Sequence, residues 1–260
     1  MHVLDIVSQA WSIGRNNRHT ASHRFNHSDR KPLIPGWHHK YITGFYQINS
    51  IISKIEIPVY SKDDLKYNNK EWKWEDKDFP RIPALLSFGR MINELNISSE
   101  KMLTFNAPSD PELEYIKTGI RHNFNYKDDR EKNDLHSFDF KDKDYDFVMI
   151  NQTIEHLYNP YIVVKNIYKH MRIDGYLYIN APCNNIPHEE PNHFYTGFTS
   201  AGLGAIVLES GFEIIRIGQW GNFDYLTKLF KEGWADYKIC SWNNEKSCPI
   251  ICWVLAKKLI

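Results

Sequence analysis

Residues 145–160 read YDFVMINQTIEHLYNP and carry the clearest signals of fold class in the chain. Residues 145–151 form an apolar run of strand length, which predicts a buried strand. Asn159-Pro160 predicts the start of a helix that ends near Met171. A second apolar run, GYLYINAP at 175–182, predicts another strand, and a polar loop follows at 184–196. A strand, a helix and a strand in this order predict two neighbouring parallel strands of an α/β fold.

The flanking sequence extends the same pattern. Strands are predicted at 101–105, 120–126, 212–218 and 249–258, and helices at 84–95 and 199–210. A short helix over 111–119 is also expected, with Ser109 or Asp110 as its N-cap and Gly119 at its end. We therefore divide the chain into an N-terminal extension or substrate cap, 1–83, and an α/β domain, 84–260.

Polar residues follow the two central strands of this prediction. Asn151 and Gln152 come after the first strand, and Pro182 with the 184–196 loop comes after the second. Ligand sites in open α/β sheets lie at the carboxyl ends of the strands, so these residues are expected to lie along one rim.

Composition limits the class of protein. The 260 residues are 42% hydrophobic and 14% aromatic, which is enough for a packed core and excludes a wholly disordered chain. The formal net charge is zero, which argues against a nucleic-acid or membrane partner. No apolar run approaches the ~20 residues of a membrane span, and the start of the chain lacks a secretory pattern. The four cysteines lack paired C-x-x-C spacing, so we expect reduced thiols and a cytoplasmic protein.

The N-terminal segment has a local excess of positive charge. Between Arg15 and Lys40 there are six Arg or Lys against one acid, Asp29. This segment is either a basic surface for a phosphorylated or acidic substrate, or a solvated segment without such a role.

Two groups of histidines were considered as metal ligands, and neither predicts a metal site. HEEPNH at 188–193 is similar to the zinc motif H-E-x-x-H, but it is one residue too long and Pro191 prevents the required helix. His19, His23 and His27 would align on one helical face, but no carboxylate or cysteine completes a ligand set.

From residue 101 onward the ordered motifs resemble class I S-adenosylmethionine-dependent methyltransferases, in particular the group with Glu-His-Leu after the fourth strand. The matching positions are Tyr145–Val148, Ile154–Leu157, Asn159-Pro160, Asp174–Leu177, Pro182, Pro191–His193, Gly211-Phe212 and Trp253–Lys258. This resemblance implies a Rossmann-like, mostly parallel seven-stranded sheet with one antiparallel strand near its end and helices on both faces.

The resemblance also implies a cofactor, S-adenosylmethionine, and an acceptor that is a small molecule or a glycan hydroxyl. It places the catalytic group at Glu155, His156 and His193, with His193 as the candidate base. The positions that it assigns to the cofactor are Phe105, Asn106, Ala107, Pro108, Asn125, Tyr126, Asp134, Leu135, His136, Asn151 and Gln152.

The chain departs from the family pattern after its first predicted strand. Residues 103–109 read LTFNAPS and contain no glycine, whereas the family has a glycine-rich loop that lets the backbone approach the cofactor. A second interpretation is therefore a catalytically inactive binding or scaffold protein on the same fold. A third, a nicotinamide or nucleotide-sugar enzyme, lacks its own glycine motif as well. The sequence leaves the oligomeric state open.

Overall fold

The computed structural model describes residues 49–64, 80–105, 109–125, 134–138, 143–189, 191–236 and 238–260. The chain divides into two units, residues 1–44 and 45–260, of which the first lies outside the described residues. Most of the predicted extension, including the basic segment with His19, His23 and His27, therefore lies outside them too. The second unit contains all the residues that the structure describes.

This unit alternates strands and helices, as predicted. Its helices are α3 (Arg81–Glu94), η5 (Pro111–Glu114), η6 (Ile154–His156), α4 (Pro160–His170), α5 (Ser200–Glu209) and α6 (Phe223–Glu232). Its strands are β1 (Ser99–Phe105), β2 (Thr118–Phe124), β3 (Tyr145–Asn151), β4 (Met171–Pro182), β5 (Glu213–Trp220) and β6 (Ile251–Lys257).

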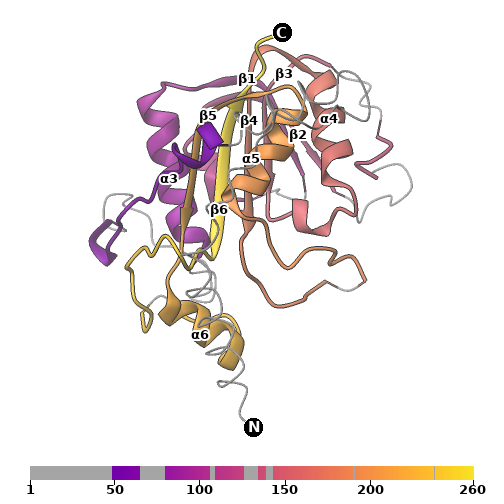
Figure 1. The fold of residues 1–260 in the computed structure, drawn as a ribbon. Coiled ribbons are helices and arrows are strands. Elements are labelled where there is room, and N and C mark those ends of the chain that lie inside the picture. The colour runs from indigo at the N-terminus through magenta and orange to yellow at the C-terminus, as the bar shows by residue number, and fades with distance from the viewer. Residues whose placement is uncertain are drawn as a thin grey trace, which may run out of the picture. The chain divides into compact units, whose positions relative to one another are not determined.

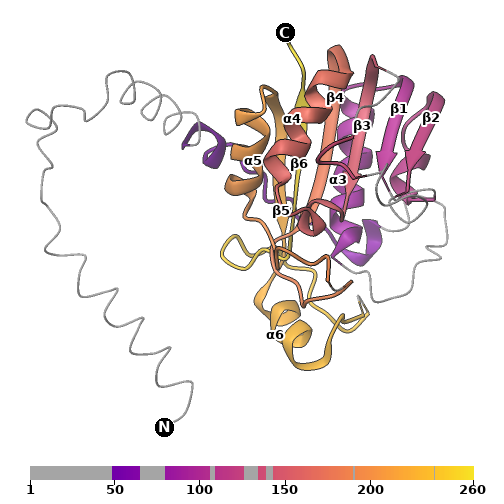
Figure 2. The same cartoon turned by 90° about the vertical axis from the view of Figure 1, so that its right-hand side faces the viewer.

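The strands form one sheet in the order β2-β1-β3-β4-β6-β5 (Figures 1 and 2). All neighbours along β2-β1-β3-β4 pair in parallel, and β6 pairs antiparallel with both β4 and β5. The mostly parallel sheet with one antiparallel strand is thus confirmed. The described residues contain six strands rather than the expected seven.

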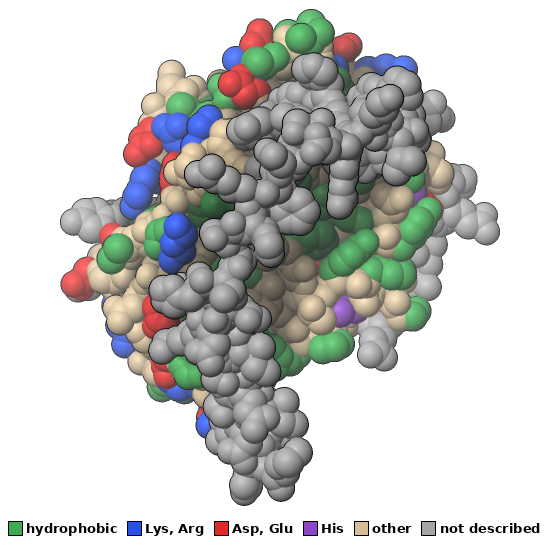
Figure 3. All heavy atoms as spheres, in the orientation of Figure 1, with side chains coloured by type: hydrophobic (Ala, Val, Ile, Leu, Met, Phe, Trp, Pro, Cys, Tyr) green, Lys and Arg blue, Asp and Glu red, His purple; other side chains and the backbone are tan. Residues whose placement is uncertain are grey.

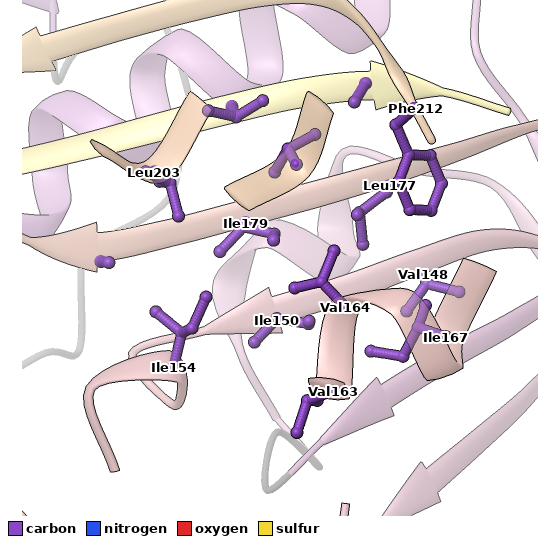
Figure 4. Packing of buried hydrophobic residues seen from close by; sticks show 14 of the residues in the cluster. Val148, Ile150, Ile154, Val163, Val164, Ile167, Leu177, Ile179, Leu203 and Phe212 are labelled. Carbon is purple, nitrogen blue, oxygen red and sulfur yellow. The ribbon is translucent and has the colours of Figure 1, made fainter. Parts of the chain in front are cut away.

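Helices cover both faces of this sheet. Figure 1 views the sheet nearly edge-on, with α3 on one side and α4 and α5 on the other. On the α4 side, apolar residues of β3 and β4 pack against both helices (Figure 4). The strands contribute Val148, Ile150 and Leu177, and the helices contribute Val164 and Leu203. Every residue of β3 is buried, as expected for a parallel strand covered on both faces.

Local sequence explains where the helices begin. The Asn159 side chain accepts a hydrogen bond from the Ile162 backbone at 3.2 Å, and Pro160 takes the first turn of α4. Thr199 caps α5 in the same way, accepting a hydrogen bond from the Gly202 backbone at 3.0 Å.

Two local predictions were wrong. The helix expected over 111–119 is only the single turn η5, and Gly119 lies within β2 instead of ending a helix. Asp110 precedes η5 but makes no side-chain cap, because its carboxylate is held by other groups. No element was predicted for 220–242, where the structure has α6 at the end of the sheet at which the parallel strands stop (Figure 1).

Within the described ranges, every helix is too short or too polar to cross a lipid bilayer.

Candidate active site

The predicted rim exists at the carboxyl ends of β3 and β4. Asn151 lies beside Asn180 in the sheet register. The Gln152 backbone donates to the Asn180 carbonyl at 3.1 Å, and the Gln152 side chain donates to the Asn180 side-chain oxygen at 2.6 Å. Gln152 has a φ of 44°, in the left-handed region, a conformation that side chains other than glycine adopt mainly where surrounding contacts impose it.

A polar network joins this rim to the segment after β1. The Asn151 amide donates to Asp110 Oδ2 at 2.8 Å, and Arg81 Nη2 lies 3.3 Å from the same carboxylate oxygen. Arg81 Nη2 also lies 3.4 Å from Glu112 Oε2. Arg81, Asp110 and Glu112 were not predicted, because only the fold brings these three segments together.

Glu112 is a fully buried carboxylate in this network. Burial raises the pKa of Glu112, and the positive charge of Arg81 opposes that rise only in part. The side-chain oxygen of Asn151, Oδ1, is also buried, and it accepts no hydrogen bond from the described part of the chain. An unsatisfied buried oxygen of this kind calls for a donor from a ligand or water.

Residues 134–136, which the resemblance assigns to the cofactor, are held in a defined conformation. Asp134 Oδ1 accepts hydrogen bonds from the His136 backbone at 3.0 Å and from His136 Nδ1 at 2.7 Å. His136 Nε2 accepts from the Asn159 backbone at 3.2 Å, so the proton of the neutral ring is on Nδ1. The ring stacks on Tyr158 with centroids 3.8 Å apart.

This arrangement keeps Asp134 ionised. Burial acts to raise the pKa of Asp134, but the hydrogen bonds from His136 outweigh it and lower that pKa below its ordinary value. The Asp134 side chain remains 41% exposed, whereas Leu135 packs against the core. Asp134 is therefore the member of this segment that can accept a hydrogen bond from a ligand.

Of the other predicted cofactor positions, the structure describes Phe105 and Asn125. Phe105 is buried, with its ring 6.4 Å from that of Phe124, so its side chain belongs to the core. Asn125 is half-buried at the end of β2. Asn106, Ala107, Pro108 and Tyr126 lie outside the described residues.

The three predicted catalytic residues lie together at the carboxyl ends of β3 and β4. Glu155 and His156 belong to η6, and the 184–196 loop is fixed to them by backbone hydrogen bonds from Phe194 and Tyr195 to the Glu155 carbonyl, each 3.1 Å. His156 Nδ1 donates to the Asn192 carbonyl at 2.9 Å, and the His156 and His193 rings have centroids 5.6 Å apart.

Glu155 has the least usual environment of the three. Its side chain is fully buried, and neither carboxylate oxygen accepts a hydrogen bond from the described residues. Burial raises the pKa of Glu155 to about 7. Burial also lowers the pKa of His156, which favours the neutral imidazole. A carboxyl group near neutrality beside a neutral imidazole can take up or release a proton at physiological pH.

The rim also borders a small cavity and an apolar surface. A cavity of about 70 Å³ lies between Arg81, Gln152, Pro182 and Asn184 on one side and Tyr225 and Trp234 on the other. Tyr158 and Phe194 are 57% and 50% exposed, and their ring centroids are 6.2 Å apart. Figure 3 shows hydrophobic side chains and histidine exposed side by side on this part of the molecule.

An open α/β sheet with its polar residues at the carboxyl ends of the strands defines a ligand-binding α/β protein. Residues 88–227 match the model of a family described as a methyltransferase domain, which is more than half of the chain. The chain therefore belongs to the methyltransferase domain family. This confirms the resemblance to class I methyltransferases, whose methyl donor is S-adenosylmethionine.

Several solved structures are similar in fold. A SAM-dependent methyltransferase from Methanosarcina mazei is 12% identical, with 65% of this chain and 97% of that chain covered and a TM-score of 0.41. One from Archaeoglobus fulgidus is 19% identical, with 66% and 93% covered and a TM-score of 0.43. The N-methyltransferase NodS from Bradyrhizobium japonicum is 9% identical, with 71% and 97% covered and a TM-score of 0.44. At these values the likeness says nothing about the substrate. No curated protein matches the chain.

Proposed function

We propose that the protein is a methyltransferase that uses S-adenosylmethionine and methylates a hydroxyl group of a small molecule or a glycan. The observation that carries the proposal is the meeting of two sets of groups at one edge of the sheet. One set, Asn151 and Asp134, offers acceptors for the donor molecule. The other, Glu155, His156 and His193, offers proton acceptors.

The residues of the rim fit the polar parts of S-adenosylmethionine. Asn151 Oδ1 is a buried oxygen without a hydrogen bond from the described residues, and the α-ammonium of the methionine part would donate to it. The ionised, partly exposed Asp134 would accept from the exocyclic amine of the adenine. When bound, the cofactor supplies an electrophilic methyl group.

The protein's own residues would then align the acceptor and remove its proton. Methyl transfer depends chiefly on placing the acceptor oxygen in line with the methyl group, and a nearby base takes the proton that the hydroxyl loses. One of Glu155, His156 and His193 would act as this base. His193 is the first candidate, because it lies on the 184–196 loop, on the side where the acceptor would bind.

The surface beside the site favours an acceptor with a planar or ring-shaped apolar face. Tyr158 and Phe194 expose their rings next to η6 and the loop. Exposed aromatic rings bind the apolar faces of sugars or planar molecules by stacking. A phosphorylated or acidic acceptor would draw on the basic segment between Arg15 and Lys40, which lies outside the described residues.

A specific observation favours a second candidate, a binding or scaffold protein without catalysis. The segment after β1 has no glycine, and Asp110 from that segment is bonded to Asn151 at the place where the family holds its cofactor. The cavity of about 70 Å³ is also well below the ~300–1,000 Å³ of most small-molecule sites. Binding of the cofactor would require this segment to move.

Incubation with methyl-labelled S-adenosylmethionine distinguishes the two candidates. The labelled cofactor is mixed with a panel of phenols, sugars and primary amines, and the products are separated. Label in an alkali-stable methyl ether supports the proposal, and label only in amines would replace it with N-methylation. Cofactor binding without label in any product would support the binding protein.

A further inference from the structure

The fold brings a third histidine to the two that were assigned a catalytic role. His188 and His193 lie on the 184–196 loop, and His156 lies on η6. One ring nitrogen from each of the three lies within 4.8 Å of the corresponding nitrogens of the others. Their ring centroids are 4.7 to 5.6 Å apart. Sequence spacing did not indicate this cluster, because His156 is far from the other two along the chain.

Hydrogen bonds fix which nitrogen two of these rings present. His156 Nδ1 is 2.9 Å from the Asn192 carbonyl oxygen, and His188 Nδ1 is 3.0 Å from the Ile186 carbonyl oxygen. A carbonyl oxygen only accepts, so each Nδ1 carries the proton and each Nε2 of the neutral ring has a lone pair. Metal-binding histidines usually have this arrangement, with one nitrogen held by a carbonyl and the other on the ion.

The environment of Glu155 independently favours a cation at this position. Its carboxylate is fully buried and accepts no hydrogen bond from the described residues, and Oε1 lies 3.9 Å from His156 Nε2. An isolated buried carboxylate is costly unless a charge or a set of donors compensates it. A divalent ion held by His156 would lie next to this oxygen and neutralise it.

The loop that supplies two of the histidines is fixed at several points. Its ends are joined by the Phe198 backbone donating to the Pro182 carbonyl at 2.8 Å, and its middle is bonded to the Glu155 carbonyl. Nitrogens around a tetrahedral ion with metal–nitrogen distances of ~2.0–2.1 Å lie about 3.3 Å apart. The three nitrogens, now within 4.8 Å of one another, would therefore approach one another by at most about 1.5 Å on binding the ion.

We propose that His156, His188 and His193 bind a zinc ion, with the Glu155 carboxylate beside it as a fourth ligand or as the acceptor for a zinc-bound water. Three imidazoles with an oxygen in the fourth position suit zinc better than magnesium or calcium, which take oxygen ligands. With zinc bound, the lone pairs of His156 and His193 would be on the ion, so the proton acceptor of the proposed reaction would be Glu155 or a zinc-bound hydroxide instead of His193. The zinc proposal refines the proposed function in this way, but metal binding does not require that S-adenosylmethionine binds. It also revises the expectation from sequence that no metal site is present.

Cobalt titration tests the site directly, because a low-coordinate cobalt ion absorbs visible light and replaces zinc. The full chain without a polyhistidine tag is stripped with a chelator, and Co²⁺ is added until absorbance no longer rises. We expect saturation at an equimolar amount and displacement of cobalt by zinc. No visible absorbance, or no saturation near equimolar cobalt, would overturn the proposal.

Variants locate the ion. His156→Ala, His188→Ala and His193→Ala are each expected to lower zinc affinity by at least the ~10–100-fold that loss of a second-shell group costs, and Glu155→Gln by about that amount. Circular dichroism establishes that each variant is folded. A matched control replaces His19, His23 and His27 together by Ala. Loss of zinc in that control, with the cluster variants unaffected, would place the ion in the N-terminal segment and overturn the proposal.

The same protein samples separate this proposal from the proposed function. Zinc binding without binding of S-adenosylhomocysteine would leave the metal site standing and reject the methyltransferase. Binding of S-adenosylhomocysteine without zinc would do the reverse.

Discussion

Asn151 and Asp110 are joined by a hydrogen bond of 2.8 Å across the carboxyl ends of β3 and β1. The bond uses the amide of Asn151 and leaves Oδ1, buried, without a donor from the described residues. One residue thus ties the glycine-free segment to the sheet and offers an acceptor to a ligand. The two candidate functions differ at this bond. A methyltransferase would use Asn151 Oδ1 to bind the cofactor, whereas a scaffold protein without catalysis would use Asn151 only to hold the segment after β1.

Asn151→Ala is expected to weaken binding of S-adenosylhomocysteine at least tenfold. A hydrogen bond to a charged group contributes ~1.5–3 kcal/mol, and about 1.4 kcal/mol is a factor of ten in affinity. Titration calorimetry measures the change. Asn93→Ala, on the exposed side of α3, is the matched control and should bind as the wild type does. Equal affinities for the two variants would remove Asn151 from the cofactor site.

Glu112→Gln is expected to change how stability depends on pH. The folded pKa of Glu112 is raised, so its contribution to stability is present below the unfolded value and is lost as pH rises through the folded pKa. The wild type should therefore lose free energy of unfolding relative to Glu112→Gln as pH rises from about 4 upward. Urea unfolding of both proteins at several pH values gives this difference. A difference that stays constant or grows in favour of the wild type would contradict the account.

His193→Ala is expected to lower turnover by about 100-fold, because the change removes either the general base itself or a ligand of the zinc ion that would supply it, and loss of a general base typically costs ~10²–10⁴ in rate. The affinity for S-adenosylhomocysteine should not change, since the proposed contacts to the cofactor are on other residues. Transfer of the labelled methyl group measures the rate, and calorimetry measures the affinity. His122→Ala, on β2, is the control. Unchanged turnover in His193→Ala would reject the role of this residue.

Gly197→Ala is expected to destabilise the loop that carries His188 and His193. A Cβ at this position would lie 2.1 Å from the Cys183 carbonyl oxygen and 2.9 Å from the Asn184 backbone nitrogen. Overpacking of this kind costs ~1–3 kcal/mol, which urea unfolding detects. Gly202→Ala, in α5, has only the Thr199 hydroxyl at 3.1 Å and should lie within about 0.5 kcal/mol of the wild type. Equal stabilities would show that the loop adjusts freely.

Most of the fold follows from local sequence. The apolar run at Tyr145–Asn151 and the Pro160 start of α4 predict β3 and its crossover helix, because burial and backbone geometry act locally there. The chain at 111–119 has good cap residues but forms only η5, because Asp110 and Glu112 are drawn to Arg81. A tertiary contact has overridden the local preference in that segment.

The site could be predicted only in part, for the same reason. Asn151, Gln152 and Glu155 could be proposed as site residues from sequence, because they lie at or just after the end of a predicted strand. The partnership of His156 with His188, and that of Asn151 with Asp110, depends on how separate loops dock at one edge. No spacing within a single segment indicates either pair.

Calorimetric titration of the wild type and of Asp134→Ala with S-adenosylhomocysteine tests the central claim most directly. Asp134 is held ionised and partly exposed by His136, so it is the acceptor that a bound adenine would use. We expect saturable micromolar binding by the wild type and binding weakened about tenfold or more in the variant. Absence of detectable binding by the wild type, with the protein folded and zinc supplied, would contradict it and leave the fold as a scaffold without its cofactor.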